Sequence, residues 1–270
     1  MTWWESVILG LIQGLTEFLP VSSSGHLVLG QHILGLQTET GDVLFEVLLH
    51  FGTIMSVLFV YRKKVASLTT GFFSKLIHFG QWGASYREDE HFRTGILILV
   101  TMIPTFAVYA IWGTYIESLF SSPRLASGML LVTGTLLLLT RLRKSPSGDL
   151  NAPKSFLIGL AQAAAMIPGI SRSGATICTA LYQDVEPTKA ADFSFLILLP
   201  VVLGATIFKV GGAISDIPDA RWVILILGTL IAFLSGIVAI KLVLEAVRKG
   251  QLQYFAIYCF LAGGIGLFLL

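Results

Sequence analysis

Charged residues and cysteines are both scarce in this chain of 270 residues. Asp, Glu, Lys and Arg make up 13% of it and hydrophobic residues 54%, with a mean hydropathy of +0.80. A soluble globular protein has roughly 25% charged residues, so the composition excludes an ordinary soluble domain and predicts a polytopic membrane protein. The two cysteines, Cys178 and Cys259, lie in apolar stretches and indicate neither a disulfide framework nor a cysteine-based metal site.

Several standard motifs are also missing from the sequence. It contains no Walker motif, no zinc-ligand spacing and no dinucleotide-binding glycine pattern. The N-terminal residues Met1 to Glu5 carry no basic segment ahead of the first apolar run, so we expect no cleaved signal peptide. The basic residues fall in loops between apolar segments, and we therefore expect no nucleic acid partner.

Six apolar segments are long enough to cross a membrane, at 43–61, 95–112, 125–139, 190–208, 222–240 and 252–270. Four shorter segments form two pairs, 3–19 with 24–34 and 155–167 with 173–182, each interrupted by Pro, Gly and Ser. We predict that each pair is a re-entrant helical hairpin, because irregular backbone at membrane depth is tolerated only inside protein or beside a polar cavity. Residues 62–93 are predicted to be a polar connection with an interfacial helix over 70–82.

The two halves of the chain resemble each other at a fixed offset. Residues 10–13 match 159–162, and residues 22–25 match 171–174, both 149 positions apart. Each half holds one hairpin and three spans, an odd number, so the halves would have opposite orientations. The fold class predicted is therefore an all-α polytopic membrane protein with an inverted-topology repeat. It forms one domain over 1–270, with repeat one at 1–144 and repeat two at 153–270.

Loop charges predict the orientation of this protein in the membrane. The loops 62–93, 141–154, 183–189 and 241–251 fall on one side and contain 14 of the 18 Lys and Arg residues. Cytoplasmic loops are enriched in these residues. We therefore predict a multi-pass protein of the inner (plasma) membrane, with both termini extracytoplasmic.

The first hairpin contains a polar run from Gln13 to His26. Glu17 is a carboxylate at membrane depth, which indicates either a functional acid or a hydrogen bond that staples the loop. The serines before Gly25 suit either a phosphate cradle at a helix N-terminus or ordinary N-capping. His26 is a candidate general acid, base or nucleophile that could approach Glu17 across the turn. We interpret His50, in the first span, as structural.

The second hairpin supplies the cation that the first one lacks. Arg172 at membrane depth needs an anionic partner, either Glu17 or a bound phosphate. Its neighbours Ser171, Ser173 and Thr176 add hydroxyl groups. Together the two loops predict an intramembrane site for a phosphorylated amphiphile. The residues alone leave open hydrolysis of a phosphate ester or pyrophosphate, transport of an organic anion, or a purely structural Arg172–Glu17 strut.

Two stretches resemble the signature motifs of the undecaprenyl-pyrophosphate phosphatase family, which confers bacitracin resistance. They are residues 17–26, EFLPVSSSGH, and residues 168–176, PGISRSGAT. The resemblance implies a membrane hydrolase that converts undecaprenyl pyrophosphate to the monophosphate and inorganic phosphate, recycling the carrier lipid for cell-wall peptidoglycan synthesis. It also implies dependence on a divalent cation, Mg²⁺ or Ca²⁺. The alternative is a flippase or transporter of polyprenyl phosphate or another anionic lipid. A homodimer is a candidate assembly.

The resemblance also assigns roles to residues. It makes Glu17 the essential acid, as a metal ligand or in proton transfer, Ser23 the suggested nucleophile, His26 the general base or a rival nucleophile, and Arg172 the pyrophosphate clamp. Water remains a third candidate nucleophile. The family motif begins with Glu or Gln, and Gln13 here leaves Glu17 as the only acid. The substrate-binding set is Gln13, Ser22, Ser24, Gly25, Ser171, Ser173 and Thr176.

Overall fold

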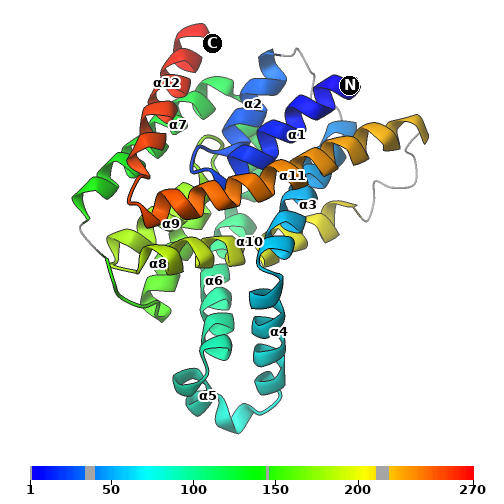
Figure 1. The fold of residues 1–270 in the computed structure, drawn as a ribbon. Coiled ribbons are helices and arrows are strands. Elements are labelled where there is room, and N and C mark those ends of the chain that lie inside the picture. The colour runs from blue at the N-terminus through cyan, green and yellow to red at the C-terminus, as the bar shows by residue number, and fades with distance from the viewer. Residues whose placement is uncertain (1, 34–39, 144–145, 211–218) are drawn as a thin grey trace.

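The computed structural model describes residues 2–33, 40–143, 146–210 and 219–270, and every regular element in these ranges is helical. The fold is shown in Figure 1. The α-helices are α1 (Trp3–Phe18), α2 (Ser23–Ile33), α3 (Thr40–Val60), α4 (Arg62–Leu76), α5 (Trp82–Glu88), α6 (Glu90–Ser118), α7 (Pro123–Leu139), α8 (Ala152–Ala164), α9 (Arg172–Tyr182), α10 (Pro187–Val210), α11 (Asp219–Arg248) and α12 (Gln253–Leu269).

Four described helical stretches are by themselves long and apolar enough to cross a membrane: Glu90–Ser121, Pro123–Leu142, Pro187–Gly204 and Trp222–Arg248. A fifth candidate combines the end of α3 with α4, which meet at a bend of 86°. Large hydrophobic side chains such as Ile111, Val223 and Phe268 are exposed on these and other helices, as expected where lipid replaces water. The protein is thus an all-helical integral membrane protein with four or five candidate spans among its described residues.

Both predicted helix breaks are present. The chain leaves the helix after Phe18 and re-enters it at Ser23, and it leaves again after Ala164 and re-enters at Arg172. Pro20 and Pro168 stand in these breaks, where a residue without a backbone N–H interrupts the helical ladder. The polar motifs therefore lie on two short loops, each flanked by short helices.

Glycines let the first helix of each broken pair approach a long helix closely. A Cβ atom at Gly14 of α1 would lie 2.4 Å from the carbonyl oxygen of Ala232 on α11. One at Gly159 of α8 would lie 2.5 Å from the carbonyl oxygen of Thr101 on α6. Small residues at such contacts allow the backbones to pack by van der Waals contact in an apolar setting. The two breaks are thereby fixed against α11 and α6.

The structure corrects the prediction for residues 62–93. The expected interfacial helix over 70–82 is wrong, because the helix that starts at Arg62 ends at Leu76 and the chain then reverses through a 3-10 turn and α5. Phe72 of α4 stacks on Phe92 of α6, with ring centroids 5.6 Å apart, and also covers Gly95. These aromatic contacts pair the two helices, and the α4–α6 hairpin projects from the body of the molecule (Figure 1).

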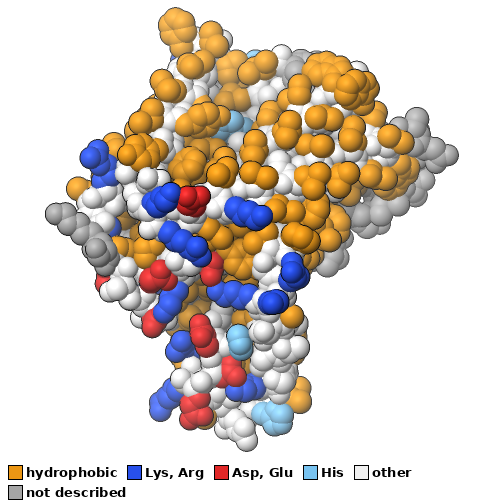
Figure 2. Space-filling view, viewed as in Figure 1, with side chains coloured by type: hydrophobic (Ala, Val, Ile, Leu, Met, Phe, Trp, Pro, Cys, Tyr) orange, Lys and Arg blue, Asp and Glu red, His pale blue; other side chains and the backbone are white. Residues whose placement is uncertain are grey.

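The molecule has two chemically different ends. Figure 1 shows both chain termini at the end opposite the α4–α6 hairpin. Figure 2 shows charged side chains gathered over this hairpin and its base, while hydrophobic side chains cover most of the remaining visible surface. A polar end and an apolar body are what a protein partly embedded in lipid presents.

Candidate active site

The two polar loops meet, as predicted. A Cβ atom at Gly25 would lie 2.9 Å from the Cα of Gly169, so the loops touch where neither residue has a side chain. Gly169 has a φ of +97°, a left-handed conformation that side chains disfavour. The hydroxyl of Ser173 also donates a hydrogen bond to the carbonyl of Leu19 at 3.3 Å. Two segments about 150 residues apart in the sequence thus form one site.

In each loop, a serine side chain caps the N-terminus of the helix that follows. Ser22 Oγ accepts the N–H of Gly25 at 3.2 Å, and Ser171 Oγ accepts the N–H of Gly174 at 3.1 Å. Each capping hydroxyl also lies close to another serine two residues on, at 3.3 Å from Ser24 Oγ in the first loop and 3.2 Å from Ser173 Oγ in the second. Ser22 and Ser171 therefore act as N-caps, which for Ser22 is the ordinary role that the sequence left open.

Glu17 is the centre of the polar cluster. Its Oε1 accepts a hydrogen bond from Arg172 Nη2 at 2.5 Å. Its Oε2 accepts hydrogen bonds from Ser23 Oγ at 2.6 Å and from Gln13 Nε2 at 2.9 Å. The Glu17 side chain is 5% exposed and that of Arg172 is 16% exposed. A buried carboxylate persists when it is paired and fully hydrogen-bonded, and here both loops supply the donors.

Arg172 has a second arm that the described residues do not engage. Its Nη1 is buried and finds no hydrogen-bond partner within the described part of the chain. A buried unpaired donor is costly, and the planar guanidinium suits oxygen anions that accept two hydrogen bonds. The strut to Glu17 and an anion-binding arm are therefore compatible in one side chain.

His26 is held by a partner that sequence reasoning missed. Its Nδ1 lies 2.7 Å from the carbonyl oxygen of Ser22, which only accepts, so Nδ1 carries the hydrogen. Its Nε2 lies 2.7 Å from the hydroxyl of Tyr258 on α12, and the two rings stack with centroids 5.5 Å apart. In the described structure no hydrogen bond or ion pair links His26 to Glu17. Nothing local distinguishes Tyr258 within its apolar segment, so no specific sequence signal points to it.

Thr176 contributes to helix packing, and His50 lies close to the polar cluster. The hydroxyl of Thr176 donates to the carbonyl of Arg172 and lies 2.6 Å from Ser194 Oγ, so it fastens α9 to α10. His50 was interpreted as structural, yet its Nδ1 lies 3.0 Å from Gln13 Nε2 and 3.6 Å from Glu17 Oε2. A histidine within a mainly apolar span is the signal available in the sequence.

The polar cluster does not contain a preformed set of ligands for a divalent cation. Within the described ranges no group of three or more His, Cys, Asp and Glu side chains could hold a metal ion. Glu17 is the only carboxylate in the cluster, and both of its oxygens already accept hydrogens from Arg172, Ser23 and Gln13. These residues alone therefore do not fit a resident metal ion.

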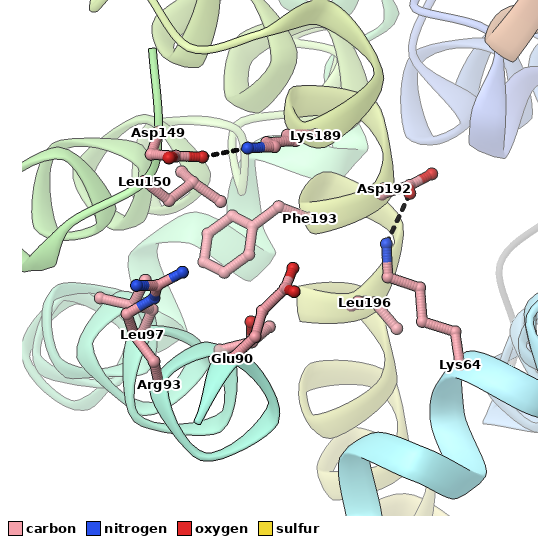
Figure 3. Close-up of a pocket in the computed structure, with 11 residues that line it drawn as sticks. Lys64, Glu90, Arg93, Leu97, Asp149, Leu150, Lys189, Asp192, Phe193 and Leu196 are labelled. Atoms are coloured by element: carbon pink, nitrogen blue, oxygen red, sulfur yellow. Dashed lines mark hydrogen bonds and ion pairs between the residues drawn. The ribbon is translucent and has the colours of Figure 1, made fainter. Parts of the chain in front are cut away.

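A second polar feature lies at the base of the α4–α6 hairpin (Figure 3). It is a cavity of about 60 Å³ lined by side chains of both signs, in which Lys64 pairs with Asp192 at 2.6 Å and Lys189 pairs with Asp149. The hydrogen bond from Lys189 holds the pKa of the Asp149 carboxyl below its usual value. None of the predicted site residues lines this cavity, and its ion pairs brace α4, α10 and the 146–151 segment.

Comparison with known proteins agrees with the motifs. A family model described as "Bacitracin resistance protein BacA" matches residues 6–265. A protein of Salinibacter ruber is 55% identical over 270 residues, covering 100% of both chains, and is named "Undecaprenyl-diphosphatase". Proteins with the same name from Desulfosudis oleivorans (41% identical, 98% of this chain and 97% of the relative) and Bacteroides thetaiotaomicron (39% identical, 97% of both) are similar over nearly their whole length. With its two motifs joined at one buried Glu17–Arg172 pair, this chain belongs to the BacA family.

Proposed function

We propose that this protein hydrolyses undecaprenyl pyrophosphate to undecaprenyl phosphate and inorganic phosphate, and so returns the carrier lipid to cell-wall synthesis. The activity is the one that its relatives' name states. The observation that carries the proposal is the Glu17–Arg172–Ser23 cluster, in which a buried guanidinium has one arm on the acid and one arm without a partner. An arginine so placed within an apolar protein suits a lipid diphosphate.

Ser23 is the nucleophile that this geometry favours. Its hydroxyl already donates to Glu17 Oε2 at 2.6 Å, the arrangement of a nucleophile and its base. In the first step Ser23 Oγ bonds to the terminal phosphorus, its proton passes to Glu17, and the bond to the bridging oxygen breaks to release undecaprenyl phosphate. Arg172 neutralises charge on the phosphoryl oxygens as it develops.

Water completes the reaction in a second step. A water molecule attacks the phosphorus of phospho-Ser23, and the Oγ–phosphorus bond breaks to release inorganic phosphate. Ser23 Oγ recovers its proton from Glu17. The proton lost by the water passes to His26, whose Nε2 carries no hydrogen when Nδ1 donates to Ser22. The hydroxyl of Tyr258 must first move away from His26 Nε2, so this movement is part of each catalytic cycle.

We also propose that Mg²⁺ or Ca²⁺ arrives with the diphosphate rather than residing on the protein. Mg²⁺ is commonly held by one or two carboxylates together with substrate phosphates. Glu17 is the carboxylate, while Gln13 turns its amide nitrogen rather than its oxygen toward Glu17. Glu17 and the diphosphate oxygens would hold the cation only while substrate is bound.

Our proposed topology is an inverted repeat of six spans and two re-entrant hairpins, in the plasma membrane with both termini outside. Matched serine caps at 22 and 171 and matched close-packing glycines at 10 and 159 support the repeat. The termini lie opposite the charged α4–α6 hairpin, which we assign to the cytoplasm. A homodimer remains part of this proposal.

Purified protein in detergent, given undecaprenyl pyrophosphate and varied divalent cations, tests the function. We expect release of inorganic phosphate in equal amount to undecaprenyl phosphate, and no release by Arg172→Ala. The same protein in liposomes, with labelled lipid in one leaflet, tests the transporter alternative. Lipid movement without phosphate release under any cation would overturn the phosphatase proposal.

A further inference from the structure

One polar side chain of the cluster has no part in the reaction steps above. His50 comes from α3, which belongs to neither signature motif, and its side chain is 32% exposed. Its Nδ1 lies 3.0 Å from the amide nitrogen of Gln13, which in turn donates to Glu17 at 2.9 Å. A chain of three side chains thus runs from α3 through Gln13 to the acid.

We propose that His50 is a positioning residue that acts through Gln13 to hold the Glu17 carboxylate against Ser23 and Arg172. An amide nitrogen has two hydrogens. One is donated to Glu17 Oε2, and the other is directed to His50 Nδ1, which accepts it with a lone pair when the ring hydrogen is on Nε2. His50 therefore acts together with Glu17 to keep the nitrogen end of the amide facing the acid.

Apart from Glu17 itself, no other described residue forms a hydrogen bond that fixes the orientation of this amide. Gln13 is fully buried, and its Oε1 finds no partner within the described part of the chain. If the amide turned over, Oε1 would face Glu17 Oε2, and two acceptors would repel each other. The carboxylate would then lose one of its two hydrogen bonds at Oε2 and be displaced from Ser23.

Among the described residues around α3, titratable side chains other than His50 and Glu17 do not contact Gln13. Glu46, one turn earlier on the same helix, is engaged by Gln31 at 2.7 Å. Asp192 and Lys64 pair with each other near Tyr61, at the far end of α3. On α11, which packs along α3, residues 222–240 include no titratable side chain. His50 is therefore the titratable side chain that contacts Gln13 on this side.

The test rests on the proposed phosphatase activity and is made on the full-length protein with undecaprenyl pyrophosphate. We expect His50→Phe to lower kcat by about tenfold, the size of one lost orienting hydrogen bond, with KM changed by less than about twofold. We expect His50→Asn to restore kcat to within about threefold of wild type, because Asn Oδ1 occupies the place of the imidazole Nδ1 as an acceptor. The matched control is His78→Phe on the exposed hairpin.

A double-mutant cycle separates a contact through Gln13 from a general packing effect. Gln13→Met removes the amide at similar volume, and we expect His50→Phe to have no further effect in that background. The inference is overturned if wild-type protein is active but His50→Asn is as slow as His50→Phe, if the loss is confined to KM, or if the losses multiply in the double variant. An inactive wild type would instead overturn the proposed function. If His50→Phe does not fold, kcat of Gln13→Met is the test. An unchanged kcat would show that Gln13 does not position Glu17 and would overturn the inference.

Discussion

The two site loops share a set of capping contacts and differ in their chemistry. Both have a serine N-cap, a second hydroxyl two residues later and a glycine in the first turn of the following helix. The residue directly after the cap differs, being Ser23 in the first loop and Arg172 in the second. The first loop also follows a helix that supplies Glu17. Similar capping contacts therefore accompany an acid and a hydroxyl in the first loop and a cation in the second.

This division means that neither loop is sufficient by itself. Glu17 depends on Arg172 for charge compensation, and Arg172 depends on Glu17 for its position, because a buried charge without its partner is strongly unfavourable. The capping serines, by contrast, form hydrogen bonds within their own loops. Changes to the residues that differ between the loops should therefore abolish chemistry, while changes to the shared residues should affect mainly stability.

The largest effect is expected at the cation of the second loop. Arg172→Ala should lower phosphate release by at least about 10³-fold, because it removes both the charge and the free arm that we assign to the diphosphate. Arg172→Lys keeps the charge without the planar fork and should retain a small part of the activity. Phosphate release measures the effect, and gel filtration in detergent checks the fold. Near-normal turnover by Arg172→Ala would remove the proposed clamp.

The next effect is expected at the matching position of the first loop. Ser23→Ala should lower phosphate release by about 10²-fold or more, since it removes the hydroxyl that donates to Glu17. Acid quenching during turnover, followed by mass spectrometry, should find a phosphoryl group on Ser23 in the wild type and none in the variant. A phosphoryl group on His26 would assign the nucleophile to the imidazole and contradict our assignment.

Much of this arrangement follows from the sequence, and the parts that do not are long-range contacts. Short apolar segments broken by Pro and Gly predicted both helix breaks, since these residues act locally. A buried Arg and a buried Glu predicted the pairing of the loops, because each charge needs the other. His50 and Tyr258 were not identified as site residues, because their roles depend on how α3 and α12 pack against the loops. The α4–α6 hairpin was missed because the contacts of Phe72 with Phe92 and Gly95 override its polar composition.

A smaller effect should distinguish the two matched glycines. At Gly25 an added Cβ would lie 2.9 Å from the backbone of Gly169, which cannot move aside easily, while at Gly174 the nearest atoms lie 3.1 Å away or more. We expect Gly25→Ala to destabilise the protein by about 1–3 kcal/mol. Gly174→Ala should change stability by less than about 1 kcal/mol, because improved helix propensity offsets the crowding. Thermal unfolding in detergent compares the two, and equal losses would show that the loops do not touch at Gly25.

The smallest effect concerns the shared caps. Ser171→Ala should cost about 1 kcal/mol, the usual loss when an N-cap hydroxyl is removed from a helix. Ser22 differs because its φ is +72°, a conformation that an ordinary side chain adopts at a cost of roughly 1–2 kcal/mol. Ser22→Gly loses the cap but relieves this strain, so the unfolding temperature should fall by less than for Ser171→Ala, whose shift should be about 2–4 °C. A larger drop for Ser22→Gly would contradict this prediction and show that the lost cap outweighs the relieved backbone strain.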